Sequence, residues 1–332
     1  MNYLGIDYSV KNMPALDPGF IPFGVWAKAY LKEADRPFKI AVERDHGKIT
    51  VYETRLRGEA FAAANIRFAE RLVKMLLWSA GGFRIYLQGD DTIAAQIRDA
   101  YRPGGAREFD AGFEFDMFER PLEVIICSED DFPTANELPI RVGGHTNGCR
   151  IGFDAGGSDR KVSAVIDGKT VYSEEVVWHP KTSADPQYQF DGIVTAFKTA
   201  ASKMPRVDAI GVSSAGVYIN NHTMSASLFL KVSPEDYEKY VKDIYIRAAK
   251  EIGDVPLTVC NDGDVTALAG AMSLGEDGIL GIAMGTSEAG GYVDMKGNIT
   301  GWLNELAFVP CDLAPDAMVD EWSGDIGCGV KY

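Results

Sequence analysis

Polar residues and glycines follow four predicted strands in the second half of the chain, and their types suit phosphate chemistry. They occupy positions 154–158, 214–216, 261–262 and 285–287. Glycine lets the backbone approach a phosphate closely, and a carboxylate at a strand end can hold Mg²⁺ directly or through water. Because open α/β sheets bind ligands at the carboxyl ends of their strands, we expect these loops to form one site.

The roles within that site follow from what phosphoryl transfer requires, namely positioning, electrostatic stabilisation and one base. Asp262 comes directly after an apolar strand and could remove a proton from a substrate hydroxyl. Each motif taken alone has an ordinary alternative. A glycine-serine turn is usually only a turn, Asp262 or Asp264 could cap the following helix, and Glu305 by itself is an ordinary surface acid.

Composition excludes several classes of protein. The chain has 332 residues and a net charge of −15, with −3 in residues 1–150 and −12 in the remainder. This distribution argues against a nucleic-acid partner, and substrate phosphates would need Mg²⁺ rather than a ring of Lys and Arg. We find neither a membrane-length apolar run nor a signal-peptide pattern. Five scattered cysteines without a CxxC pair indicate a reducing cytoplasm.

The first 148 residues are predicted to form a separate small α/β domain. Residues 1–35 contain Pro14, Pro18 and Pro22, and we expect them to be irregular. Hydrophobic periodicity predicts strands at 38–42, 48–56, 84–88 and 122–127 and helices at 60–78 and 92–101. Residues 128–146 have the composition of a linker.

From residue 151 the pattern changes to strands that alternate with helices. Three strands are followed by a helix at 189–204, a strand at 209–212 and a helix that begins at the capping box Ser233-Pro-Glu-Asp236 and runs to residue 252. A strand at 256–260, a helix at 265–272 and strands at 278–283 and 291–293 complete the series. This alternation predicts an α/β lobe with a largely parallel sheet.

The order and spacing of the motifs resemble the ROK family of sugar kinases and sugar-responsive regulators, within the actin-like ATPase superfamily. Gly152-Phe-Asp-Ala-Gly-Gly-Ser158 is similar to its first phosphate motif, and Ala283-Met-Gly-Thr-Ser-Glu-Ala-Gly-Gly291 to its second. Ile210-Gly-Val-Ser-Ser-Ala-Gly216 resembles its sugar-side loop, and Val259-Cys-Asn-Asp-Gly-Asp264 its Asn-Asp-Ala-Asn segment. Asn304-Glu-Leu-Ala-Phe308 resembles its Gly-Glu-x-Gly-His segment.

The resemblance, which covers residues 151–308, implies a role for each matching position. Asp262 would be the general base, Asp154 would organise Mg²⁺, and the sugar would contact Asn261, Glu305 and Gly216. The phosphates of ATP would face the two glycine-hydroxyl turns, which consist of Gly156, Gly157, Ser158, Gly285, Thr286 and Ser287. The implied fold is a ribonuclease H-like lobe of an actin-like ATPase.

Several positions depart from the family pattern. Phe308 replaces a histidine that binds sugar and often zinc, and the clustered cysteines are absent, so we predict no zinc site. Asp159 stands where lysine is common, and Glu288 lies inside the second motif. Only about 40 residues follow Gly291, so the second lobe is expected to be incomplete, as in a fragment. The resulting domains are 1–148, 149–262 and 263–332.

The leading hypothesis is a cytoplasmic, ATP-dependent sugar kinase that acts on a hexose or amino sugar. A non-catalytic sugar-sensing protein on the same scaffold is the alternative, and an actin-like ATPase with a non-sugar substrate is a third. The expected partners are sugar and ATP, with neither nucleic acid nor membrane. A homodimer, the identity of the sugar and the role of residues 1–148 stay open.

Overall fold

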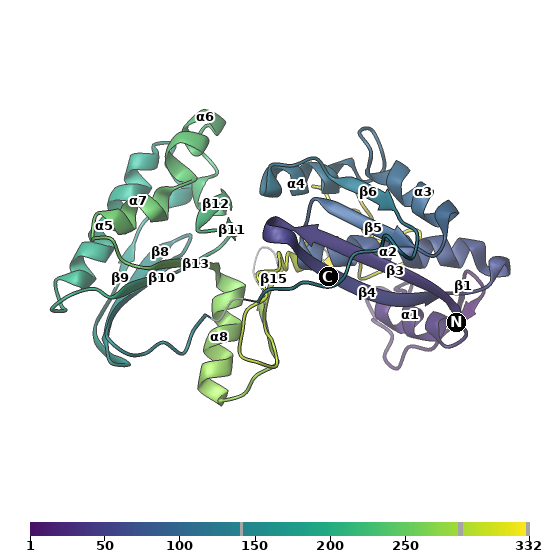
Figure 1. Cartoon of the computed structure of the whole chain (residues 1–332), viewed down its shortest axis with the longest axis horizontal. Coiled ribbons are helices and arrows are strands. Elements are labelled where there is room, and N and C mark those ends of the chain that lie inside the picture. Colours follow the sequence, from purple (N-terminus) through teal and green to yellow (C-terminus); the bar gives the residue numbers. More distant parts are fainter. Residues whose placement is uncertain (140–141, 285–287, 330–332) are drawn as a thin grey trace. The chain divides into compact units, whose positions relative to one another are not determined.

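The computed structural model describes residues 1–139, 142–284 and 288–329, and these form two compact units (Figure 1). The N-terminal unit comprises Met1–Pro139, Met284–Ala289 and Thr300–Tyr332, and the second unit comprises Ile140–Ala283 and Gly290–Ile299. The sequence interpretation grouped residues 300–332 with 263–299, whereas the structure groups them with the N-terminal unit. Among the described residues, no helix is both long and apolar enough to cross a membrane.

A four-stranded mixed sheet forms the centre of the N-terminal unit. β3 (Arg36–Arg44) pairs antiparallel with β4 (Lys48–Leu56) and with β5 (Arg84–Gln88), and β5 pairs parallel with β6 (Glu123–Ile126). The helices of this unit are α1 (Phe23–Leu31), α2 (Ala62–Ala80), α3 (Asp91–Tyr101) and α4 (Glu108–Phe118). Two short strands, β1 (Asn2–Tyr3) and β2 (Ile6–Asp7), pair near the N-terminus.

Two helices of this unit differ from the sequence prediction. The expectation that residues 1–35 lack a regular element is wrong, because α1 begins after Pro22 and buries Trp26 and Tyr30 completely. The prolines precede this helix and do not interrupt it. The sequence analysis also missed α4, whose apolar residues are spread around its circumference and give little amphipathic signal.

A network of buried ions connects α2 to the C-terminal segment of the same unit. Asp325 lies 2.8 Å from Arg71, 3.4 Å from Lys74 and 2.6 Å from Arg107, and Lys74 also lies 2.8 Å from Asp110. Lys74 and Arg71 are fully buried. Because a buried ion is tolerated only with a partner, the segment that carries Asp325 is part of this unit's core.

The second unit has a five-stranded sheet in the order β13-β10-β7-β8-β9. These strands are Leu257–Asn261, Ala209–Ser214, Cys149–Ala155, Asp159–Ile166 and Lys169–Val177. β7, β8 and β9 are successively antiparallel, whereas β7, β10 and β13 run parallel. This is the ribonuclease H-like arrangement, and it confirms the α/β fold predicted for the lobe. The expectation of a largely parallel sheet is wrong, because β7, β8 and β9 are joined by tight hairpins and therefore pair antiparallel.

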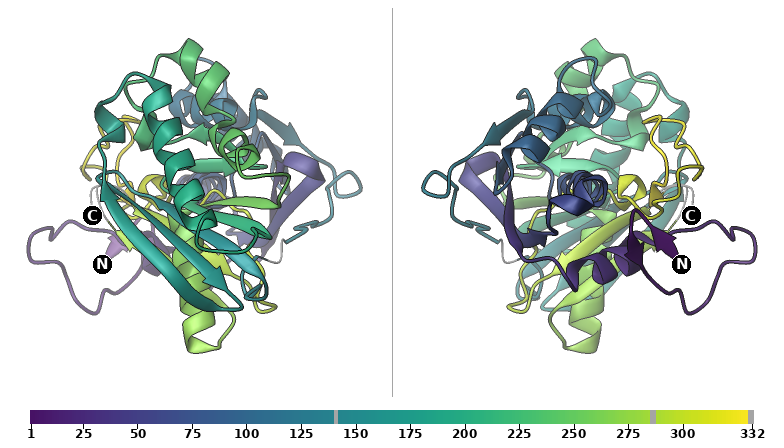
Figure 2. Two further views of the ribbon diagram at one scale, coloured as in Figure 1. Left: turned by 90° about the vertical axis from the view of Figure 1, so that its left-hand side faces the viewer. Right: turned by 90° about the vertical axis from the view of Figure 1, so that its right-hand side faces the viewer.

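Helices cover one face of this sheet, as the side views show (Figure 2). α5 (Pro186–Ala201) and α7 (Ile244–Lys250) bury Phe197 and Tyr245 against strand residues such as Phe153. The predicted helix from Ser233 to residue 252 is divided into α6 (Pro234–Asp236), a π-helical turn (Tyr237–Val241) and α7. Ser233 does cap it, because its side chain accepts from the N–H of Asp236. Residues 217–225 form the hairpin of β11 (Val217–Ile219) and β12 (His222–Ser225).

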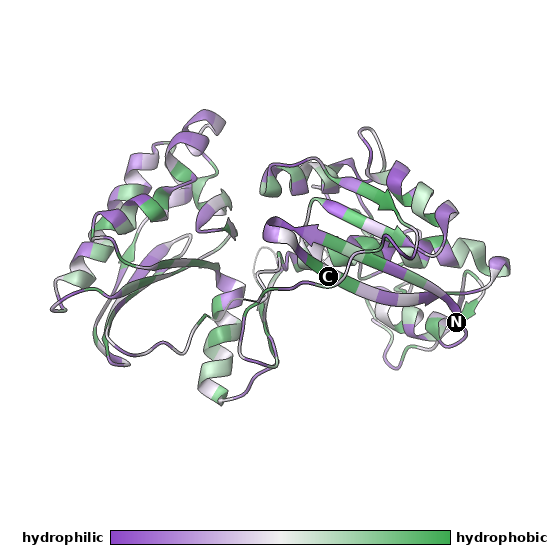
Figure 3. Ribbon diagram, viewed as in Figure 1, coloured by the Kyte–Doolittle hydropathy of each residue, from purple (hydrophilic) through white to green (hydrophobic). Residues whose placement is uncertain are grey.

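The remaining elements follow β13 directly. α8 (Asp262–Leu274) is succeeded by β14 (Ile279–Met284) and β15 (Glu288–Val293). Its first turn is acidic, and small and apolar residues dominate the rest, as the colouring of Figure 3 shows. The acidic turn lies at the amino end of the helix, where negative charge is favoured by the helix dipole.

Candidate active site

Three parallel strands of the second unit end at one edge of the sheet. The strand register places Asp154 of β7 beside Ser213 of β10, and Ser213 beside Cys260 of β13. Asn261 is the last residue of β13, and Asp262 is the first residue of α8. The sheet therefore brings the ends of three sequence motifs, about 50 residues apart in the chain, to the same edge.

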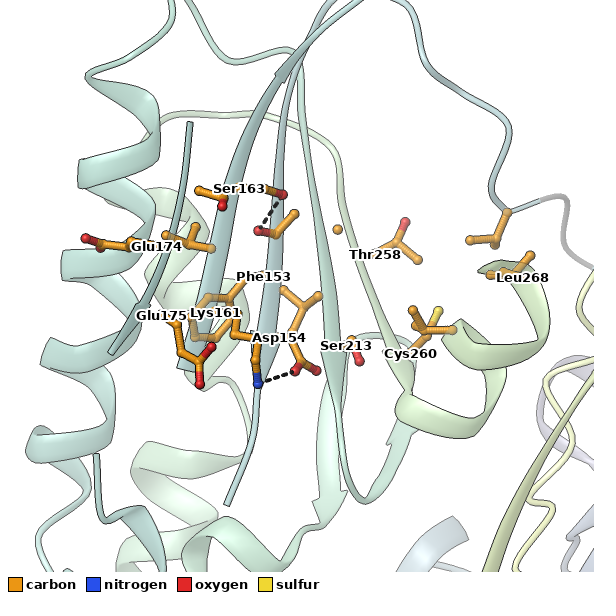
Figure 4. A pocket seen from close by; sticks show the side chains of 17 residues that line it. Phe153, Asp154, Lys161, Ser163, Glu174, Glu175, Ser213, Thr258, Cys260 and Leu268 are labelled. Atoms are coloured by element: carbon orange, nitrogen blue, oxygen red, sulfur yellow. Dashed lines mark hydrogen bonds and ion pairs between the residues drawn. The ribbon is translucent and has the colours of Figure 1, made fainter. Parts of the chain in front are cut away.

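A cavity of about 670 Å³ lies over the sheet and reaches this edge at Asp154 and Ser213, but neither the glycine turn nor Asp262 is among its lining residues (Figure 4). Asp154, Lys161 and Ser213 lie close together on its wall, while Cys260 and Leu268 line another side. Gly152 and Gly211, which pair across β7 and β10, keep the floor free of side chains. The volume is in the range of small-molecule sites.

The glycine turn after β7 is held by β9 and its extension. The indole N–H of Trp178 donates to the carbonyl of Gly156 at 2.8 Å, and the backbone N–H of Trp178 donates to the carbonyl of Ser158 at 3.0 Å. A Cβ on Gly156 would lie 2.7 Å from the carbonyl oxygen of Asp159, so only glycine fits there. Within the described part of the chain, no protein acceptor is seen for the N–H groups of Gly157 and Ser158. The turn can therefore offer these donors to an anion.

The acids beside this turn are partly neutralised by Lys161. Its ammonium hydrogen-bonds to Asp159 and lies 4.0 Å from Asp154. The hydrogen bond from Lys161, with a second one from the Ser158 hydroxyl, lowers the pKa of Asp159. The repulsion that Asp159 was expected to exert on a triphosphate is therefore reduced.

Asn261 joins the second loop to the start of α8. Its Nδ2 donates to the carbonyl of Gly216 at 2.8 Å, and its Oδ1 accepts from the N–H of Gly263 at 2.7 Å. Asn261 is thus the helix cap, instead of Asp262 or Asp264. Gly216 has a φ of 137°, and a Cβ there would lie 2.3 Å from the carbonyl oxygen of Ser225. Both residues fix the loop geometry at this edge.

Asp262 is a half-buried carboxylate with a perturbed pKa. Its Oδ1 accepts from the N–H of Gly263 at 3.0 Å. Burial raises the pKa of Asp262, and the negative charge of Asp154 raises it further against the effect of this hydrogen bond. A raised pKa makes a carboxylate a stronger base, which is the property that proton abstraction requires.

Asp264 lies two residues after Asp262 in α8 and is 8% exposed. Its carboxyl accepts a hydrogen bond from the backbone N–H of Tyr292 in β15. α8 packs closely against β15, because a Cβ added to Gly291 would lie only 2.2 Å from the carbonyl oxygen of Gly263. Burial, followed by repulsion from Asp262, raises the pKa of Asp264 to about 7.

Replacing Asp264 with asparagine should stabilise the protein at pH 8. The pKa of Asp264 is about 7 in the folded protein and 3.8 in the unfolded chain, so the folded state favours the protonated carboxyl. The stability that Asp264 contributes is therefore present below pH 4 and is lost as the pH rises to 7. Asp264→Asn should therefore raise the free energy of unfolding at pH 8 by up to about 4 kcal/mol, and the gain should vanish near pH 4.

Denaturant unfolding of the full chain between pH 4 and pH 8 measures this difference. Asp254→Asn, which removes an exposed acid from the same unit, is the control and should show no such pH dependence. If the free energies of unfolding of Asp264→Asn and of the unmodified protein differed by the same amount at every pH in this range, Asp264 would have an ordinary pKa in the folded protein.

Other predicted site residues fall elsewhere. Glu305 belongs to the N-terminal unit, where its N–H donates to the carbonyl of Trp78 at 3.1 Å. Gly285, Thr286 and Ser287 lie outside the described residues. The role of Glu305 toward a sugar and the role of the second turn toward ATP stay predictions.

Sequence reasoning missed two residues that shape the glycine turn. Lys161 could have been found, because a hairpin that turns at residues 156–159 must place Lys161 opposite Asp154. Trp178 carried no such signal, since its contact with the turn depends on how β9 continues beyond its pairing with β8. The sequence analysis also considered Asp264 only as a helix cap.

Comparisons with known proteins bear on the fold alone. No protein-family model and no curated protein matches the sequence. Among solved structures, the ROK hexokinase from Thermus thermophilus is similar at 19% identity and a TM-score of 0.42, with 54% of this chain and 57% of that chain covered. The inorganic polyphosphate/ATP-glucomannokinase from Arthrobacter sp. strain KM is similar at 22% identity and a TM-score of 0.39, with 52% of this chain and 68% of that chain covered.

A ROK family transcriptional regulator, a homolog of the E. coli MLC protein, is also similar, at 18% identity and a TM-score of 0.38, with 55% of this chain and 46% of that chain covered. The chain resembles ROK proteins. It spans about half of the length of the hexokinase and of the regulator. Because these TM-scores are below 0.5, we base the functional proposal on the residues of this chain.

One departure from the ROK pattern has a structural reason. Phe308, at the position of the ROK histidine, is 4% exposed and stacks on Trp78 with ring centroids 4.3 Å apart. Phe109 and Trp322 also contact it. Phe308 is therefore part of an aromatic core in the N-terminal unit. The absence of zinc stays a prediction, to be tested by elemental analysis.

Proposed function

We propose that this chain is an ATP-dependent sugar kinase of the ROK type. The observation that supports this proposal best is the common sheet edge, where a glycine turn and Asp154 follow β7 and Asp262, a carboxylate with a raised pKa, follows β13, two strands away. An anion-binding turn and a base are the two components that transfer of a phosphoryl group to a hydroxyl requires.

The proposed reaction begins with a primary hydroxyl of a hexose or amino sugar near Asp262. Asp262 accepts the hydroxyl proton as the oxygen forms a bond to the γ-phosphorus of ATP. The bond from that phosphorus to the bridging oxygen breaks, and ADP leaves. The N–H groups of Gly157 and Ser158 hold phosphate oxygens. Gly285, Thr286 and Ser287, which lie outside the described residues, are also proposed to bind the phosphates.

Asp154 fits a role in binding Mg²⁺. Its side chain is 44% exposed at the end of β7, where the oxygen ligands that Mg²⁺ prefers can include phosphate and water. The ion would neutralise phosphate charge beside Asp154, Asp262 and Asp264. Asn261 and Glu305 are proposed to contact sugar hydroxyls, with Gly216 shaping the loop. We expect this activity in the cytoplasm, where the five free cysteines stay reduced.

A second candidate is a non-catalytic sugar sensor on the same scaffold. Phe308 favours it, because its ring packs in the aromatic core where a kinase of this type has a ligand-binding histidine.

A coupled ADP-release assay across hexoses and amino sugars tests the proposal, with sugar binding measured in parallel by calorimetry. The kinase proposal predicts ADP release that depends on one class of sugar and on Mg²⁺. Sugar binding without ADP release would favour the sensor. ADP release that is independent of every sugar would favour an ATPase with another substrate.

A further inference from the structure

We propose that Lys181 is a phosphate-binding residue of the first glycine turn, and this inference rests on the proposed function. Lys181 lies in the short 3-10 turn Pro180–Thr182, between β9 and α5. A methyl group added to the Cα of Gly157 would lie 2.5 Å from Cε of Lys181 and 2.8 Å from its Nζ. The lysine side chain therefore lies directly over the middle residue of the turn.

The backbone around Lys181 is fixed to both the turn and the helix. Trp178, three residues earlier, makes the two hydrogen bonds that hold the carbonyls of Gly156 and Ser158. Gln189 of α5 is fully buried, and its Nε2 donates to the carbonyl of Pro180 at 2.9 Å. Because Pro180 is itself buried, the lysine extends from an anchored segment. These contacts fix the backbone from which the side chain of Lys181 reaches Gly157.

The charge of Lys181 is available to a ligand. Among the described residues, no carboxylate lies within ion-pair distance of its ammonium, and its side chain is exposed. Lys161, which is also near the turn, is bonded to Asp159. The ammonium group of Lys161 is therefore already paired with a carboxylate, whereas that of Lys181 can bind a phosphate.

Gly157 and Lys181 together define the chemistry of the ligand. The N–H groups of Gly157 and Ser158 and the ammonium of Lys181 are all donors, and charge-assisted bonds to phosphate oxygens are the strong class. A lysine from the β9–α5 connection supplies a cation to the same turn in this chain. The ligand is the polyphosphate chain of ATP.

Calorimetry on the full chain with Mg²⁺ tests this role, using ATP, inorganic tripolyphosphate and adenosine as probes. Lys181→Met should weaken binding of ATP and of tripolyphosphate by about tenfold and leave adenosine unchanged. Lys181→Arg should recover part of the loss, because it restores the charge. Lys169→Met is the matched control, since Lys169 begins β9 at the opposite end of the strand, and it should bind as the unmodified protein does.

The outcomes separate this inference from the proposed function. Unchanged binding of ATP and tripolyphosphate by Lys181→Met would overturn the role of Lys181 and leave the kinase proposal standing. If the unmodified chain binds neither probe at millimolar concentration, both proposals are wrong. Equal weakening by Lys181→Met and Lys169→Met would indicate a general charge effect and also overturn the inference. Thermal unfolding should be unchanged in each variant, because both side chains are exposed.

Discussion

Replacing Asp262 with asparagine should reduce sugar-dependent ADP release by a factor of roughly 10²–10⁴, the usual contribution of a general base. Asparagine retains the oxygen that accepts from Gly263 at 3.0 Å, so the start of α8 should keep its structure. Sugar affinity should stay within a few-fold of the original value. The coupled assay gives the rate, and calorimetry gives the affinity.

The pH profile of the unmodified protein provides a second measurement on the same residue. Because burial and the charge of Asp154 raise the pKa of Asp262, the rate should rise with pH through a midpoint above 3.8, the ordinary value for an aspartate. Asp254→Asn, an exposed acid of the same unit, should leave the rate unchanged. Near-normal turnover by Asp262→Asn would remove this residue from the mechanism.

Asp325→Asn should lower the free energy of unfolding by about 3–5 kcal/mol, as expected when one member of a buried ion network is neutralised. Burial opposes ionisation of Asp325, but Arg71 and Lys74 outweigh it and lower its pKa. Without that charge, the three cations Arg71, Lys74 and Arg107 have too few carboxylate partners in a largely buried site. A loss of this size is a large part of the stability of a typical domain.

Denaturant unfolding at pH 7 measures this effect, with Asp316→Asn as the control. Asp316 is an exposed acid of the same segment, and its replacement should change the free energy of unfolding by less than about 0.5 kcal/mol. If Asp325→Asn and Asp316→Asn had the same free energy of unfolding, the buried ion network would make no net contribution to stability. The lowered pKa also predicts that the contribution of Asp325 is present above pH 4 and lost as the pH falls below it.

The sequence predicted the elements whose signals are local. β4 and β5 begin and end at the predicted residues, because alternating apolar residues are bounded by turns that include His46-Gly47 and Gly81-Gly82. The motif residues around Asp154 and Asp262 could also be assigned to strand ends, since each follows an apolar run. Parallel pairing of β7, β10 and β13 then brings those ends together.

The sequence could not predict contacts that join distant segments without a periodic pattern. Residues 300–329 are mostly irregular, so nothing in their spacing indicates that Asp325 ion-pairs with Arg71 or that Phe308 stacks on Trp78. Lys181 was missed for the same reason, because its proximity to Gly157 depends on the path of the chain after β9. In both cases the side chain is identifiable only after its partner is placed in space.

The pairing of Asp325 with residues of α2 has a consequence for synthesis on the ribosome. The partners are separated by 254 residues in the chain, so α2 emerges long before its counter-charge has been translated. Until then, Arg71 and Lys74 have only part of the negative charge that their burial requires. The five-stranded sheet of the second unit needs no residue beyond Asn261 and can form earlier. The unit that comes first in sequence should therefore be the second to complete its fold, and pulse proteolysis of stalled nascent chains would show protection of residues 149–261 before residues 62–80.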